Sequence, residues 1–239
     1  MTTQIELEVR PALARRLFAE FLGTGLLVAA IVGSGIAASQ LSNGQVGLEL
    51  LENAIATAAV LFVLIATLGS VSGAHFNPLV SILDVWLGHF RPREVAPYGI
   101  AQIAGAVGGA ILANLMFGLS AVSWSTNDRA TGPHLLAEVV ATAGLMLVIF
   151  GLTRGGHHSL VAPAVAAYIA GAYWFTSSTS FANPAVTIGR MFSDSFAGIA
   201  PSSVLPFIGA QIIGAGIGLA IVLALWPNRH PVQPSGVTV

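Results

Sequence analysis

Long runs without a charged residue dominate this chain and decide what it can fold into. They cover residues 21–48, 53–83, 95–127, 139–153, 155–189 and 195–228. Lipid offers no hydrogen-bonding partner to the backbone, so apolar runs of this length predict membrane-spanning helices of about twenty residues each. Only 8% of the residues are charged and 55% are hydrophobic, whereas a soluble domain carries roughly 25% charged residues. The chain is therefore predicted to be an integral membrane protein in contact with the lipid bilayer.

Composition also excludes several classes of function. Cysteine is absent, so the chain has no disulfide framework, no thiolate metal site and no cysteine nucleophile. The net charge of −1 gives no reason to expect a nucleic-acid partner. His75 has no second histidine or carboxylate at ligand spacing, so we expect no metal site.

The arginines predict the orientation in the membrane. If the spans alternate, seven of the nine basic residues fall on one side: Arg10, Arg15, Arg16, Arg91, Arg93, Arg154 and Arg229. Arg129 and Arg190 fall on the other side. Basic residues accumulate in cytoplasmic loops, so both termini are expected to be cytoplasmic.

Two of the apolar runs are too long for one span, and each contains an Asn-Pro pair. The segments read SGAHFNPLVSILD at 72–84 and SSTSFANPAVTIGR at 177–190. Asparagine suits the N-cap of a helix and proline suits its first turn. Short helices are therefore predicted to begin at both pairs, the first ending near Trp86 and the second before Asp194.

The two halves of the chain repeat each other. Ala19-Glu20 matches Ala137-Glu138, and the glutamines and glycines of the third and sixth spans match as well: Gln102, Gly105 and Gly109 with Gln211, Gly214 and Gly218. The repeats cover about 12–119 and 134–226 of one domain (1–239), with spans expected at about 12–38, 53–71, 95–119, 134–153, 160–176 and 202–226. Three spans per half is an odd number, so the halves are inverted and the short helices meet near the midplane.

The paired motifs within inverted repeats resemble the aquaporin and aquaglyceroporin (major intrinsic protein) family over about residues 12 to 226. The resemblance implies an all-α membrane protein with six transmembrane helices and two re-entrant half-helices. It further implies a homotetramer in a bacterial inner membrane, with a passive pore in each subunit and no cofactor. Two helix N-termini that face each other make a positive node in the pore centre, hostile to cations and protons.

The resemblance assigns roles to particular residues. The pore centre is formed by Asn77, Pro78, Leu79, Asn183, Pro184 and Ala185, with the two asparagine amides pointing into the lumen. Carbonyl groups along one wall come from Gly73, Ala74, His75, Phe76, Thr179, Ser180, Phe181 and Ala182. The buried carboxylates, which an enzyme would use as an acid/base pair, instead support the loops together with the two glutamines: Glu20, Glu138, Gln102 and Gln211.

The expected selectivity filter departs from the family pattern. Counting from the two asparagines places it at Thr57, Gly171, Ser180 and Val186. The family normally has arginine at the position of Val186, and its water-selective members place an aromatic residue and a histidine in this set. The filter resembles that of bacterial aquaglyceroporins linked to arsenic resistance, which conduct glycerol and neutral metalloid acids such as arsenite.

Two charges near the ends of the half-helices can compensate for the missing arginine. Arg190 lies four residues after Val186, on the same helical face and nearer the outer mouth. Asp84 is expected to face the cytoplasmic vestibule. Each residue can equally well cap or anchor its half-helix, and two other functions stay open. One is a secondary transporter, because inverted repeats serve both classes; the other is a mainly water-selective channel.

Overall fold

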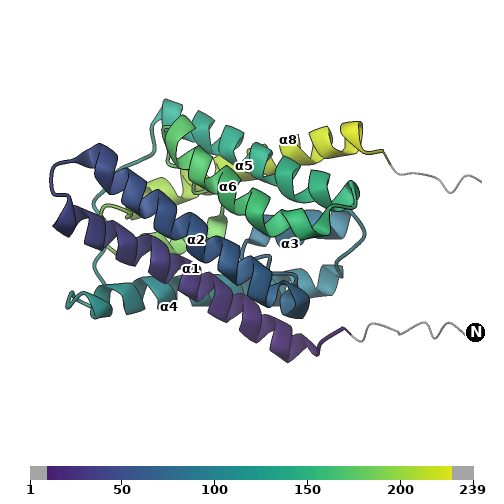
Figure 1. Cartoon of the computed structure of the whole chain (residues 1–239), viewed down its shortest axis with the longest axis horizontal. Helices are drawn as coiled ribbons and strands as arrows, with labels where there is room; N and C mark the ends of the chain where they lie inside the picture. Colours follow the sequence, from purple (N-terminus) through teal and green to yellow (C-terminus); the bar gives the residue numbers. More distant parts are fainter. Residues whose placement is uncertain (1–9, 228–239) are drawn as a thin grey trace, which may run out of the picture.

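A computed structural model describes residues 10–227, and all regular structure in this range is helical (Figure 1). Arg229, one of the arginines that predict the orientation, lies outside the described residues. The helices are α1 (Leu13–Leu41), α2 (Val46–Ser72), α3 (Pro78–Trp86), α4 (Pro92–Met116), α5 (Gly132–Arg154), α6 (Val161–Phe175), α7 (Pro184–Arg190) and α8 (Pro201–Leu225), with a 3₁₀ turn η1 (His158–Leu160) before α6. The all-α architecture with two short helices agrees with the sequence.

Five of these helices are long and apolar enough to cross a membrane: α1, α2, α4, α5 and α8. The fifth expected span, 160–176, is shorter than predicted because α6 has 15 residues. At about 1.5 Å per residue, α6 alone does not reach the roughly 30 Å of a bilayer core. Its partner in the first half, α2, has 27 residues.

The second helix also begins earlier than predicted. The sequence indicated a polar outer loop from 39 to 52, but α1 continues to Leu41 and α2 begins at Val46. No proline or glycine cluster interrupts 48–52, and Glu49 lies in the first turn, where a negative charge is favourable. The Glu49 carboxylate accepts a hydrogen bond from the Gly44 N–H at 3.1 Å, so the turn is closed by the helix itself.

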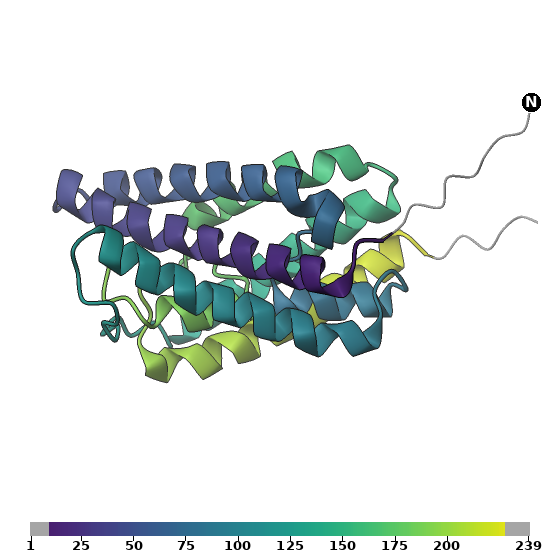
Figure 2. The same cartoon turned by 90° about the horizontal axis from the view of Figure 1, so that it is seen from below.

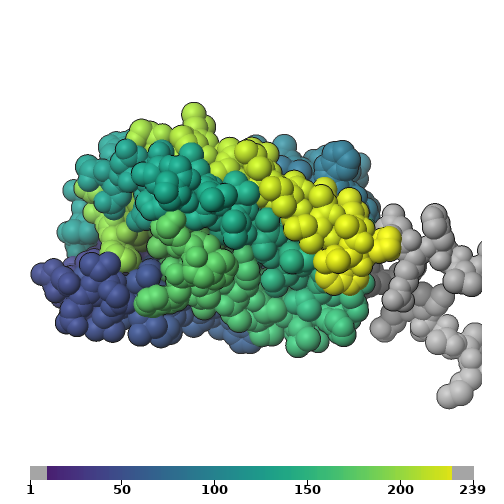
Figure 3. Space-filling model, turned by 90° about the horizontal axis from the view of Figure 1, so that it is seen from above, coloured from purple at the N-terminus to yellow at the C-terminus, as the bar shows by residue number. Residues whose placement is uncertain are grey.

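Glycines allow two pairs of helices to cross closely. A Cβ added to Gly105 or Gly109 on α4 would overlap the α1 backbone at Phe21 or Gly25. The same addition to Gly214 or Gly218 on α8 would overlap the α5 backbone. Figure 2 shows α1 and α4 side by side, and Figure 3 shows α8 lying across one face of the molecule beside α5. The glycine pattern therefore brings two equivalent helix pairs together, one from each half.

The two ends of the bundle differ. The start of α1 and the end of α8 lie at the same end (Figure 1). At the opposite end the central loop, 117–131, packs on the segment that follows α7. Ser125 N–H donates to the Met191 carbonyl at 3.0 Å, and the Ala200 N–H donates to the Asn127 carbonyl at 2.8 Å. This loop therefore braces the second half-helix from outside.

Candidate functional site

A cavity of about 1220 Å³ runs through the bundle beside both half-helices. Its walls come from α1, α2, α5 and α6 and from the two Asn-Pro segments. Asp84, His89 and His158 line it toward the end where the chain termini lie, and Arg190 lines it toward the other end. Both asparagines of the repeated motif, Asn77 and Asn183, line its middle. The cavity is thus a candidate pathway between the two faces of the molecule.

The two half-helices are joined by a reciprocal pair of hydrogen bonds. Asn77 Nδ2 donates to the Ala182 carbonyl at 2.8 Å, and Asn183 Nδ2 donates to the Phe76 carbonyl at 2.8 Å. Each asparagine Oδ1 accepts the N–H of a residue in the first turn of its own half-helix, at 3.0 Å in both cases. An amide nitrogen carries two hydrogens, so one N–H of each asparagine is available to a solute. The sequence predicted donors in the lumen but not this cross-connection.

The loops before both asparagines are held in a left-handed backbone conformation. Positive φ occurs at Ala74 and Phe76 in the first loop, both at 48°. In the second it occurs at Thr179, Ser180 and Ala182, between 50° and 63°. Such residues cost of order 1–3 kcal/mol each and persist only where the surroundings impose them. The surroundings here are two buried carboxylates.

Glu20 holds the first loop. Its carboxylate accepts the N–H of His75 at 3.0 Å and the N–H of Phe76 at 2.7 Å. Gln102 Nε2 donates to the same carboxylate at 2.8 Å and to Ser81 Oγ at 3.2 Å. The carboxylate is fully buried, and these contacts occupy both of its oxygens.

Glu138 holds the second loop with one bond more. It accepts the N–H of Phe181 and the N–H of Ala182, both at 2.9 Å, and the Ser178 hydroxyl at 2.7 Å. Gln211 Nε2 donates to it at 2.7 Å and to Thr187 Oγ1 at 2.9 Å. All four residues expected to support the loops therefore contact the loops or the half-helices.

The other pore-centre and wall residues divide into two groups. Gly73, Ala74, His75, Phe76, Ser180 and Phe181 line the cavity, whereas Thr179, Ala182, Pro78, Leu79, Pro184 and Ala185 do not. The two prolines each occupy the first turn of a half-helix. Leu79 and Ala185 are buried and contribute the backbone N–H groups that bind the asparagine Oδ1 atoms. Residues of this second group do not line the cavity, and Leu79 and Ala185 hold the side chains of the two asparagines that do.

Three of the four residues expected in the filter line the cavity, and the fourth does not. Thr57, Ser180 and Val186 are buried and line the cavity. Gly171 is exposed and is not among the lining residues. Tyr173 lines the cavity instead, and its hydroxyl donates to Thr57 Oγ1 at 3.2 Å. Counting back from Asn183 fails because residues of α6 that are two apart point in different directions.

Tyr173 could have been found from spacing on α6. Val161, Val165, Ile169 and Tyr173 recur every four residues and all line the cavity. That spacing marks one face of a helix, but α6 is apolar on all sides, so hydropathy alone does not say which face is inner.

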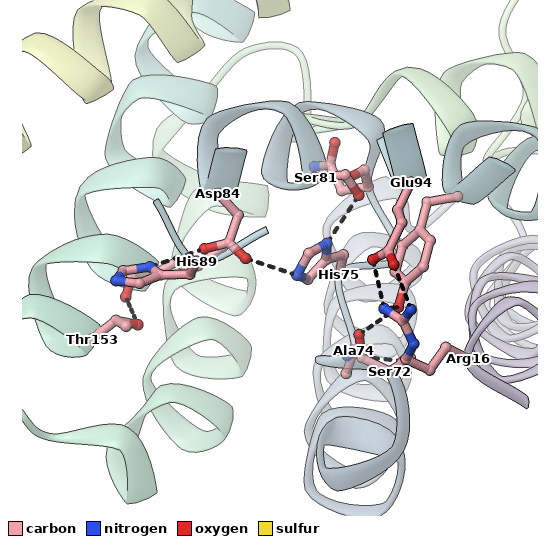
Figure 4. A network of polar contacts seen from close by, with 12 residues as sticks. Arg16, Ser72, Ala74, His75, Ser81, Asp84, His89, Glu94 and Thr153 are labelled. Carbon is pink, nitrogen blue, oxygen red and sulfur yellow. Dashed lines mark hydrogen bonds and ion pairs between the residues drawn. The ribbon is translucent and has the colours of Figure 1, made fainter. Parts of the chain in front are cut away.

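Asp84 lies in a polar network near the chain-terminal end of the cavity (Figure 4). Its carboxylate approaches His75 Nε2 at 3.5 Å and His89 Nδ1 at 3.2 Å. His75 Nδ1 in turn lies 2.9 Å from Ser81 Oγ. His75 is therefore tied to its own half-helix, and Asp84 lines the cavity beside it.

Arg190 lies at the other end of the pathway. Its side chain is 2% exposed and lines the cavity. Its Nε donates to the Ala197 carbonyl at 2.5 Å, and its guanidinium carbon lies 3.4 Å from the centroid of the Phe181 ring. The sequence placed Arg190 in an outer vestibule, and the structure buries it against the loop wall.

Comparison with known proteins agrees with this geometry. Residues 8–177 match the family model for "Major intrinsic protein". The aquaglyceroporin AqpS of Rhizobium meliloti is 46% identical over 92% of this chain and 94% of its own length. An Aquaporin Z of Brucella melitensis is 31% identical over 86% of this chain and 95% of its own. The crystal structure of the aquaglyceroporin from Plasmodium falciparum shares the fold, with a TM-score of 0.67 at 21% identity over 90% of this chain and 96% of that chain.

The members of this family are channels and not enzymes. The matched region contains the first Asn-Pro motif and six of the eight helices in full, and the relatives extend the match over most of the chain. The protein is a multi-pass membrane protein, and it belongs to the major intrinsic protein family.

Proposed function

We propose that the protein is a passive transmembrane channel for small neutral solutes: glycerol-type polyols, neutral metalloid acids such as arsenite, and water. The observation that carries this proposal is one cavity lined by both asparagines and by Val186 where the family has arginine. The aliphatic side chain leaves the outer filter without a charge at that position. Support for water and glycerol comes from the family, and support for the metalloid acids comes from valine at position 186, which we expect to widen the filter.

The polar contacts favour a channel over a coupled transporter. A coupled transporter needs an ionisable group that changes its proton or ion occupancy beside the substrate. Glu20 and Glu138 are the carboxylates at the level of the loops, and both oxygens of each accept hydrogen bonds from the protein. The charged residues Asp84 and Arg190 line the cavity at the far ends of the half-helices, and His75, which also lines it, is engaged by Ser81 and Asp84.

Solute-specific swelling of proteoliposomes tests the proposal. A channel gives a glycerol flux that rises linearly with the gradient and is indifferent to protonophores. Arsenite uptake at neutral pH, where the acid is uncharged, is measured on the same vesicles. Saturation at low concentration, or uphill movement driven by a proton gradient, would show a transporter instead.

The same vesicles separate a solute channel from a water-selective one. Water permeability is measured by osmotic shrinkage in an impermeant sugar and glycerol permeability by re-swelling in glycerol. Fast shrinkage without re-swelling above that of empty vesicles would mean a mainly water-selective pore. The proposal predicts both phases.

We further propose that the chain forms a single domain in a bacterial inner membrane, with both termini cytoplasmic, as a homotetramer with one pore per subunit. Support for the orientation comes from Arg10, Arg15, Arg16, Arg91 and Arg93, which lie near the chain-terminal end of the helices. Accessibility of tags at either terminus in intact spheroplasts tests the orientation, and native mass spectrometry tests the assembly.

A further inference from the structure

Two arginines lie near the end of the pathway remote from the chain termini: Arg190, which is buried in the pore wall, and Arg129, which is half-buried behind it. Arg190 lines the cavity, whereas Arg129 does not. Both approach the Phe181 ring: the guanidinium carbon of Arg190 lies 3.4 Å from its centroid, and that of Arg129 lies 5.4 Å away. Phe207 packs edge-on against the same ring at 5.3 Å. The ring is therefore a platform that fixes the position of the Arg190 guanidinium.

Carbonyl groups, rather than carboxylates, hold these arginines. Arg129 donates to the carbonyls of Gly198 at 2.8 Å and Phe196 at 3.0 Å, and Arg190 donates through Nε to the carbonyl between them, that of Ala197. Among the ion pairs of residues 10–227, none involves either arginine. Neutral acceptors place no carboxylate in contact with either guanidinium, so the positive charge of Arg190 borders this end of the cavity without an ion-pair partner among residues 10–227.

The terminal nitrogens of Arg190 are the donors left over. Within residues 10–227, Nε is the Arg190 atom that donates to a protein acceptor, and Nη1 and Nη2 donate to none. The side chain is 2% exposed and lines the cavity, so a solute or water in the cavity is the available acceptor. A second unsatisfied group lies close in sequence to the platform: Ser180 Oγ is buried, lacks a hydrogen-bond partner and belongs to a residue that lines the same cavity.

The residue at 186 leaves space for this arrangement. Val186 and Arg190 are four residues apart on α7 and therefore share a helical face. Both line the cavity. An arginine at 186 would place a second guanidinium one turn from the first, whereas valine leaves the longer side chain of Arg190 as the charged group on this face.

We propose that Arg190 determines the charge selectivity of the outer half of the pore, repelling cations and donating hydrogen bonds through Nη1 and Nη2 to oxygen atoms of entering solutes. Ser180, which lines the same cavity, forms part of the wall of this subsite. The ligand class is small, uncharged and oxygen-rich: polyols, undissociated oxyacids and water. This inference rests on the proposed function, since it concerns what that channel admits.

The test compares four proteins in liposomes loaded with a Na⁺-sensitive dye: wild type, Arg190→Met, Arg190→Lys and Arg129→Met. Methionine provides an unbranched side chain but removes the positive charge and the N–H donors of arginine. Lysine keeps the positive charge but lacks the planar guanidinium with its two terminal nitrogens. Arg129→Met removes an equal charge and the two hydrogen bonds to the carbonyls of Gly198 and Phe196. It does not change a residue that lines the cavity. Thermal unfolding in detergent checks that each variant is folded.

Arg190→Met should raise Na⁺ permeability by about tenfold to a hundredfold, as expected for loss of a charge about 6 Å from the ion path at an effective dielectric of about 20. Arg190→Lys and Arg129→Met should stay near the wild-type Na⁺ permeability. Glycerol permeability of Arg190→Lys should fall, because lysine presents a point charge in place of two oriented donors. An equal Na⁺ leak in Arg129→Met would show that loop anchoring explains the effect, and it would overturn the inference.

Two further measurements distinguish a failure of this inference from a folding defect and from a failure of the proposed channel function. If Arg190→Met does not fold, a NaCl dilution potential across wild-type vesicles decides, because the inference requires any residual leak to favour Cl⁻ over Na⁺. A wild-type channel without glycerol or water flux would refute the proposed function. A conducting wild type in which neither Arg190 variant changes Na⁺ or glycerol permeability would refute the inference alone.

Discussion

In the first half of the chain, α3 begins at Asn77-Pro78 and ends beside Asp84, whose side chain is 16% exposed. In the second half, α7 begins at Asn183-Pro184 and ends at Arg190, which is 2% exposed. The two starts share their caps, their reciprocal amide bonds and their buried glutamates. The two ends share neither charge nor burial. On the proposed function, we expect the symmetric part to build the pore and the asymmetric part to set what enters from each side.

Substitution of the buried glutamates is expected to have the largest effect on stability. It also tests the comparison between the two halves, because Glu138 accepts one hydrogen bond more than Glu20. Glu138→Ala leaves two backbone N–H groups, a hydroxyl and an amide without their acceptor, whereas Glu20→Ala leaves two backbone N–H groups and an amide. Each buried donor that loses its partner costs about 1–3 kcal/mol. With three donors at Glu20 and four at Glu138, we expect losses of at least about 3 kcal/mol in unfolding free energy, larger for Glu138→Ala.

Unfolding of detergent-solubilised protein, followed by tryptophan fluorescence, measures this difference. Glu20→Gln and Glu138→Gln serve as controls, since the amide keeps one acceptor oxygen and should lose less. Alanine variants as stable as wild type but without transport would assign the glutamates to the transport step and not to the loops.

Val186→Arg tests the asymmetric end. It would restore the family's arginine and place a like charge one turn from Arg190. A charge about 6 Å from a passing ion at an effective dielectric of about 20 is worth roughly 3 kcal/mol, or about a hundredfold in cation passage. Any native cation leak should shrink, glycerol and arsenite flux should fall, and water flux should largely persist.

The ratio of glycerol to water permeability at matched protein density measures the effect of Val186→Arg. Val186→Met adds bulk without charge, so it separates narrowing from electrostatics. An unchanged ratio in both variants would remove residue 186 from the filter and the wide-pore proposal with it.

The sequence predicted the repeated features of the two halves better than the contacts between them. Asn77, Asn183, Glu20 and Glu138 were predictable because each is a polar residue in an apolar run, repeated at matched spacing in the other half. The reciprocal bonds from the asparagines to Phe76 and Ala182 were not, because they depend on how closely two inverted loops approach in space.

The sequence predictions were wrong where hydropathy does not show which face of a helix points inward or where a helix begins. Gly171 was placed in the filter by counting from Asn183, but α6 is apolar toward lipid and toward the pore alike, so only the structure shows that Tyr173 faces inward. The early start of α2 at Val46 was missed because the polar residues around Asn43-Gly44 indicate a loop. In fact the turn occupies only residues 42–45.

A smaller effect tests whether the two helix crossings are equivalent. Gly109→Ala on α4 and Gly218→Ala on α8 each insert a methyl group against backbone atoms of the partner helix. Overpacking of this kind costs about 1–3 kcal/mol. Gly108→Ala and Gly216→Ala are matched controls, since a Cβ there meets nothing within 4 Å, and alanine in a helix is favoured over glycine by about 1 kcal/mol. Chemical denaturation should show that Gly109→Ala is less stable than Gly108→Ala, and that Gly218→Ala is less stable than Gly216→Ala. A Gly218→Ala variant as stable as its control would show that the two helix crossings are not equivalent.

The smallest effect is expected at Asp84. Its carboxylate faces a mouth open to solvent and lies within reach of two histidines, so its field on a permeating ion is screened. The Debye length is about 30 Å at 0.01 M salt and about 8 Å at 0.15 M. Asp84→Asn should therefore lower Na⁺ entry from this side by about twofold to threefold at low salt, an effect of less than 1 kcal/mol, and by less at physiological salt. Glycerol and water fluxes should not change, because neutral solutes do not feel the charge.

The Na⁺ leak of Arg190→Met gives the background in which that small change is measurable. Asp84→Asn is added to it and compared with His89→Gln, which perturbs the same contact but removes no negative charge. A salt-sensitive reduction with Asp84→Asn alone would establish that the acid concentrates cations at one mouth while Arg190 rejects them at the other. A large loss of glycerol flux would mean instead that Asp84 binds the solute, and the first half-helix would then select as strongly as the second.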